Sequence, residues 1–250
     1  MSMNVESSVR DEGKFGQVGL FRLAAICGII PLGVLVFDIV VTMAYGAAET
    51  TDRTAAAWID LFQQNALLGL QGLSFPQFVS VALGIPFFVA LYASLRERGS
   101  AMALLSLSLM LVGAAIFLST NAALPMMALS ERFAGASDVE RTTLVAAAEA
   151  VLARGTDFTP AGCSPFILQG TAGLLMAILM IGAKGFGRWR GWLGLAAFTL
   201  LMIFIIGASF VPGGFDLLLP VSILGGLASM VWNLAVALSL WRLSNGDKRN

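Results

Sequence analysis

The sequence predicts an all-α protein: a polytopic membrane helical bundle of six transmembrane helices, with two extracytoplasmic amphipathic helices and both termini in the cytoplasm. Three observations predict this class. Of the 250 residues, 58% are hydrophobic and only 12% are charged, with a mean hydropathy of +0.85, whereas soluble domains carry about 25% charged residues. Uncharged apolar runs recur at lengths that can cross about 30 Å of hydrocarbon. The charges collect at the ends of these runs.

The clearest apolar run carries no charge between residues 99 and 130. It follows the basic hinge Arg96-Glu97-Arg98, and it ends with the polar cluster Ser119-Thr120-Asn121, Pro125 and the pair Glu131-Arg132. A basic hinge marks the cytoplasmic side of a span. We therefore expect one membrane-spanning helix here, over about residues 101–127.

Six spans are predicted in all, each from an apolar run of about the required length. The first contains Pro31 and one acid, Asp38, with Arg22 at its inner edge. The second begins at Pro76, a favourable first helical residue, and Pro86 is expected to kink it. The spans cover about residues 23–45, 76–95, 101–127, 165–183, 192–211 and 217–241. They form a single domain, 21–243, between cytoplasmic tails at 1–20 and 244–250.

Two segments outside the spans have apolar residues at helical spacing. Trp58, Leu61, Phe62 and Leu68 recur beside polar residues, which predicts a helix lying on the membrane surface. The second segment begins with a capping-box pair, Ser137 and Glu140, and Gly155 is its expected stop. Its apolar stripe consists of Leu144, Ala147, Ala148, Val151 and Leu152.

The charges predict the orientation. With both termini and the hinges after spans two and four on one side, that side holds eleven of the 15 basic and five of the 15 acidic residues, a net charge of +6. The opposite side holds four basic and nine acidic residues, a net charge of −5. The positive-inside rule therefore places both termini in the cytoplasm.

Several functions are excluded or disfavoured by composition. The chain contains no histidine, which excludes a His-ligated haem protein, a Ser-His protease and a zinc hydrolase with histidine ligands. The balanced net charge argues against nucleic acid binding. Cys27 and Cys163 lie near opposite ends of their spans, too far apart for a disulfide. We expect no metal and no cofactor, and we interpret Met126, Met127, Met176 and Met180 as core or lipid-facing residues.

The candidate site consists of polar residues at membrane depth. An ionisable residue inside a span costs at least about 2.5 kcal/mol by insertion scales and indicates function by default. If the polar faces of spans one to four converge, they form an outward-facing polar pocket for a small molecule or a lipid. The alternative is that these side chains make interhelical hydrogen bonds. The candidate ligand-binding residues are Asp38, Gln77, Ser119, Thr120, Asn121 and Gln169.

The third and fourth spans also carry a resemblance to a known family. The runs Leu118–Ser130 and Asp138–Leu152, and the hinge Phe186-Gly187-Arg188 followed by Trp192-Leu193-Gly194, resemble bacterial multi-helix membrane proteins of domain-of-unknown-function family 4386. The resemblance covers about Leu95 to the C-terminus. It implies a fold of about six membrane helices in the bacterial cytoplasmic (inner) membrane, and it supplies no activity or catalytic residues.

Three classes of function stay open. The first is a protein that binds a small molecule or lipid in the polar pocket, including a transporter. The second is a non-catalytic accessory or structural subunit, whose small-residue helix faces dock a partner membrane subunit or a second copy of the chain. The third is an intramembrane enzyme, which is disfavoured because no nucleophile and base occur at workable positions.

Overall fold

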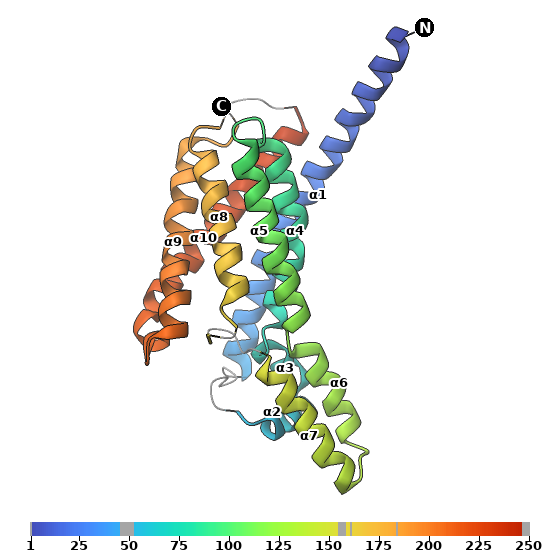
Figure 1. Ribbon diagram of the computed structural model, residues 1–250, viewed down its shortest axis with the longest axis vertical. Coiled ribbons are helices and arrows are strands. Elements are labelled where there is room, and N and C mark those ends of the chain that lie inside the picture. Colours follow the sequence, from blue (N-terminus) through green and yellow to red (C-terminus); the bar gives the residue numbers. More distant parts are fainter. Residues whose placement is uncertain (1, 46–52, 155–158, 161, 184, 247–250) are drawn as a thin grey trace.

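The computed structural model describes residues 2–45, 53–154, 159–160, 162–183 and 185–246. These residues form ten helices and no strand. Six long helices run side by side along the long axis of the molecule, and four shorter ones gather at one end (Figure 1). The long helices are α1 (Ser2–Tyr45), α4 (Phe75–Leu95), α5 (Ser100–Thr120), α8 (Ser164–Met180), α9 (Arg188–Phe210) and α10 (Gly214–Ser244). The shorter helices are α2 (Ala55–Gln64), α3 (Ala66–Gly72), α6 (Ala123–Phe133) and α7 (Asp138–Ala153).

The six long helices form a closed ring. Each packs against the next in the order α1, α4, α5, α8, α9 and α10, and α10 packs back against α1. Buried side chains fill much of the ring, among them Leu91, Leu95, Met176, Met180 and Leu240. A polar contact crosses the α5–α8 interface, where the buried hydroxyl of Ser106 donates a hydrogen bond to the main-chain oxygen of Ala172 at 2.7 Å. The six long helices thus surround a common interior, and the contact between α1 and α10 closes it.

Within the described ranges, five stretches are long and apolar enough to cross a membrane, judged by length and composition. They are Gln17–Asp38, Phe75–Leu95, Ser100–Phe133, Arg188–Phe210 and Gly214–Ser244. The remaining long helix, α8, is an apolar helix of 17 residues and is about 26 Å long at 1.5 Å per residue. It lies in the ring between α5 and α9. The first long helix begins at Ser2, so the segment predicted as an N-terminal tail is a continuation of α1.

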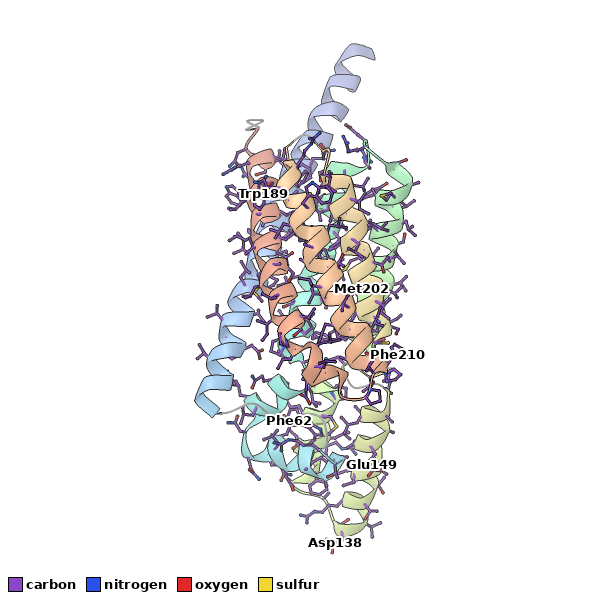
Figure 2. All side chains as sticks on the ribbon, turned by 90° about the vertical axis from the view of Figure 1, so that its left-hand side faces the viewer. Phe62, Asp138, Glu149, Trp189, Met202 and Phe210 are labelled. Carbon is purple, nitrogen blue, oxygen red and sulfur yellow. The ribbon has the colours of Figure 1, made fainter. Side chains whose placement is uncertain are left out.

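The four shorter helices form a separate small bundle with its own core. Trp58, Ile59 and Phe62 of α2 are at most 5% exposed and pack with Met126 of α6 and Ala148 of α7. The predicted surface segment is therefore two helices whose apolar face meets protein, and they are separated at Asn65, whose side chain accepts hydrogen bonds from the first turn of α3. Figure 2 shows Phe62, Glu149 and Asp138 in this small bundle, at the opposite end of the molecule from Trp189.

The predicted third span, 101–127, is divided between two helices. The helix ends at Thr120, and α6 begins at Ala123 after a break at Asn121 and Ala122. Pro125 explains the position of the break, because proline has no N–H to donate to the carbonyl four residues earlier and its ring clashes with that carbonyl. That carbonyl belongs to Asn121. α5 consequently stays in the ring, while α6 belongs to the small bundle.

The end of the ring opposite the small bundle, here called the hinge end, carries the two short basic loops. The α4–α5 loop contains Arg96 and Arg98, and α9 begins with Arg188 directly after the other loop. Arg190 ties α9 to α10 there, since its Nε donates to the main-chain oxygen of Ala235 at 3.1 Å. The C-terminal residues of α10 also lie at this end (Figure 1). The loops that the sequence assigns to one side of the membrane thus share one end of the ring.

Candidate functional site

The ring encloses a cavity of about 390 Å³, lined by residues of α1, α3, α4, α5, α8, α9 and α10. Cavities that hold small-molecule ligands measure about 300–1,000 Å³. The lining is mainly apolar, and its polar side chains come from five helices and from the turn before α4. These polar residues are Asp38, Gln71, Ser74, Gln77, Ser80, Gln169, Ser229 and Asn233.

One face of α1 forms part of the cavity wall. Cys27, Pro31, Val34 and Asp38 all line it, and their spacings of four, three and four residues place them on one side of an α-helix. Asp38 therefore shares a stripe with three apolar side chains. By helix rise it lies about 16 Å along the axis from Cys27. The carboxylate is thus placed toward the small-bundle end of the wall, where Gln77 is exposed and marks the mouth.

Gln71 positions Asp38 from a separate helix. Its side-chain Nε2, at the end of α3, donates a hydrogen bond to the main-chain oxygen of Asp38 at 3.3 Å. The Gln71 amide also hydrogen-bonds to the Asp38 side chain. The next turn contains Ser74, which has a left-handed backbone with φ of 60° and leads directly into α4. The link between the small bundle and the ring therefore forms part of the mouth.

Gln169 supplies a buried hydrogen-bond donor. It lies one and a half turns into α8, and its side chain passes Gly113 of α5, where a Cβ atom would come within 3.0 Å of its Cγ. Its Nε2 is buried and has no hydrogen-bond partner within the described part of the chain. The two serine hydroxyls nearby are differently placed, because Ser80 and Ser229 donate to main-chain oxygens of their own helices. A ligand with an acceptor atom would satisfy Gln169.

Aromatic side chains form the inner wall and close the cavity toward the hinge end. Trp232 is fully buried, with its ring edge-on to Phe87 at 6.0 Å and to Phe198 at 5.0 Å between centroids. Its indole nitrogen lies against Gly194 of α9, where a Cβ atom would come within 2.4 Å. Beyond Trp232 the interior is filled by buried residues such as Val236. The aromatic wall therefore bounds the cavity toward the hinge end, with Asn233 beside it, while most of the polar lining residues lie nearer the small bundle.

The structure brings three of the six predicted site residues together at the cavity: Asp38, Gln77 and Gln169. The other three are not among its lining residues. Ser119 and Thr120 each donate their hydroxyl to the main-chain oxygen of Ile116 within α5, at 2.9 Å. Asn121 donates from Nδ2 to the main-chain oxygen of Leu73 at 3.1 Å. These three residues stabilise the end of α5 and its junction with the small bundle.

Five polar lining residues were not predicted as site residues from the sequence: Gln71, Ser74, Ser80, Ser229 and Asn233. Asn233 had a detectable signal, because it is a polar residue inside the sixth apolar run and lies four residues after Ser229 on the same helix face. Gln71 and Ser74 had no such sequence signal, since they belong to the segment that leads into α4, and the position of that segment depends on tertiary packing. Cys27 and Cys163 are both free thiols. No group of three or more potential metal ligands occurs among the described residues.

No protein-family model, curated protein or solved structure matches the chain. The resemblance to family 4386 therefore stays a prediction.

Proposed function

We propose that this protein is a multi-pass membrane protein that binds a small amphiphilic molecule in the ring cavity. The single observation that carries the proposal is the cavity of about 390 Å³ inside the ring, whose lining combines an aromatic inner wall with polar side chains from several helices. Such a cavity accommodates an apolar body and a polar head in one ligand. Binding would be the first step of transport, which also requires a second conformation in which the hinge end opens.

The proposal places all six ring helices across the bilayer, with α8 as the sixth span. Large apolar side chains exposed on the outside of the ring support this placement, for example Leu104 on α5 at 53%, Ile203 on α9 at 48% and Leu224 on α10 at 62%. The basic hinge end then faces the cytoplasm by the positive-inside rule. The mouth and the small bundle consequently face the extracytoplasmic side.

Native mass spectrometry of the protein released gently from its own membrane tests the proposal. We expect a reproducible bound small molecule in the wild-type protein. Ser80→Phe puts a ring into the cavity from α4 and should abolish that bound mass. Ser108→Phe adds the same ring at an exposed position of α5 and should leave it unchanged.

Two outcomes would contradict the proposal. One is an absence of any bound small molecule in the wild-type protein. The other is equal retention in Ser80→Phe and wild type, which would place the molecule outside the cavity. A reproducible second polypeptide without a small molecule would instead support the accessory-subunit alternative.

A further inference from the structure

We propose that the ligand of the ring cavity is an organic cation with an apolar body. This inference rests on the proposed function and specifies the class of ligand. It follows from the charge of the lining, from the way its carboxylate is held and from the chemistry of its inner wall.

The charge of the lining has one sign. Of the described residues that line the cavity, Asp38 is the only acid, and none is a lysine or an arginine. An ionised carboxylate inside a low-dielectric ring attracts a cation more strongly than it would in water. An anionic ligand would meet a like charge with no basic side chain to offset it, which disfavours it. The lining therefore selects against anions and for cations.

The carboxylate is held in place before any ligand arrives. Gln71 hydrogen-bonds both to the main-chain oxygen of Asp38 and to its side chain, so α3 fixes the position of this residue on α1. Preorganisation of this kind lowers the entropic cost of binding. A ligand cation at the mouth would meet a carboxylate that is already positioned.

The aromatic inner wall of the cavity suits the apolar body of such a ligand. Rings of Phe87, Phe166, Phe198 and Trp232 line the cavity from four different helices. Aromatic surfaces bury apolar groups and also attract cations through their π faces. The buried Nε2 of Gln169, with no partner in the described chain, would accommodate an oxygen acceptor on the ligand.

The same chemistry can come from two sources. One is a lipid headgroup that carries an ammonium, with its acyl chain against the aromatic wall. The other is a free organic cation from the extracytoplasmic medium. A first experiment tests the charge selectivity that both sources share, and a second distinguishes between the sources.

The first arm uses two ions of matched shape and opposite charge, tetraphenylphosphonium and tetraphenylborate. Each is titrated separately into the purified protein in a neutral detergent, and binding is measured as a rise in the thermal unfolding midpoint, since a ligand that binds only the folded protein stabilises it. We expect saturable stabilisation by the cation and none by the anion. This comparison uses the wild-type protein and does not depend on a variant.

Variants then assign the selectivity to Asp38. Asp38→Asn should weaken binding of the cation at least tenfold, and Asp38→Glu should restore most of it. The matched control is Asp60→Asn, which removes the same charge from an exposed position on α2 outside the cavity. It should bind the cation as the wild type does.

The second arm identifies the source by native mass spectrometry. A retained phosphatidylethanolamine that is displaced by tetraphenylphosphonium, and lost in Asp38→Asn but kept in Asp60→Asn, would show that the cation is a lipid headgroup. Cation binding without a retained lipid would show that it is a free molecule. Either result supports the proposal.

The inference is overturned if the anion binds as tightly as the cation, or if Asp38→Asn binds the cation as well as the wild type. In both cases the cavity still holds a ligand, and the proposed function stands. If neither ion binds and no small molecule is retained from the membrane, the proposed function fails together with the inference.

Discussion

The side chain of Asn121 links two interhelical connections, because its Nδ2 donates a hydrogen bond to the main-chain oxygen of Leu73, 3.1 Å away. Its Oδ1 accepts a second hydrogen bond from the main-chain N–H of Ala123, also at 3.1 Å. Leu73 lies between α3 and α4, and Asn121 lies between α5 and α6. One amide therefore connects two of the places where the chain passes between the small bundle and the ring.

Replacing this amide should destabilise the protein. We expect Asn121→Ala to lower the free energy of unfolding by about 1–3 kcal/mol, because it leaves partly buried main-chain groups without partners. The measurement is the thermal unfolding midpoint in detergent. Ser119→Ala is the control, since Ser119 is exposed and its hydroxyl bonds only within α5, and it should change stability by less than about 0.5 kcal/mol. Equal effects of the two variants would contradict a connecting role for Asn121.

Two glycines on α1 should respond in opposite directions to alanine. A Cβ atom at Gly28 would lie 2.7 Å from the Phe87 ring and 3.1 Å from Cβ of Ala237, whereas one at Gly33 would meet nothing within 4 Å. Gly28→Ala should therefore destabilise the ring by about 1–3 kcal/mol through overpacking. Gly33→Ala should stabilise it by about 0.5–1 kcal/mol, because alanine favours the helix. Unfolding midpoints of the two variants test this, and the same sign in both would contradict the packing of α1 against α4 and α10.

The first turn of α7 should depend on pH through Glu140. The pKa of this carboxyl lies below its usual range because it accepts hydrogen bonds from the Ser137 hydroxyl at 2.7 Å and from the Ser137 main-chain N–H at 2.8 Å. A lowered folded-state pKa means that the stabilisation is fully present above the ordinary value of about 4.3. It is lost as the pH falls through the folded-state pKa.

Amide hydrogen exchange at the start of α7 measures this dependence. At neutral pH, Glu140→Ala should exchange faster than the wild type in this turn, and the difference should shrink as the pH falls below about 4. Because the variant and the wild type are compared at the same pH, the intrinsic dependence of amide exchange on pH cancels. The control is Glu149→Ala, at an exposed position later in the same helix, which should leave exchange in the first turn unchanged. A difference that persists at low pH would show that the capping box does not depend on the charge of Glu140.

The apolar runs predicted the long helices well, because length and hydropathy alone determine which segments can cross a bilayer. The predicted second span, 76–95, differs from α4 by a single residue at its start. The predicted third span, 101–127, contains a helix break that was not predicted, because hydropathy continues past Asn121 while the helix depends on local hydrogen bonding. Pro125 was the sequence feature that could have predicted this break. A proline does not by itself predict a helix end, since Pro31, Pro86 and Pro220 lie inside helices that continue.

The sequence predicted only part of the candidate site. Asp38, Gln77 and Gln169 could be found because each is a polar residue in an apolar run, and all three line the cavity. Asn121 has the same sequence signal and a different role, since the break at this residue turns its side chain to the main chain of Leu73. Which polar residue faces the cavity depends on helix rotation and on tertiary contacts. Neither is specified by the pattern of one helix alone.

The closure of the ring by α1 and α10 has a consequence for biosynthesis. The ribosome makes α1 before the other nine helices and α10 after them, yet the two are neighbours in the ring and both contribute to the cavity wall, through residues such as Asp38 and Asn233. Until α10 enters the membrane, α1 lacks one of its two ring neighbours and the cavity lacks a side. The cavity can therefore be completed only in the final step of synthesis, when the last helix joins the first.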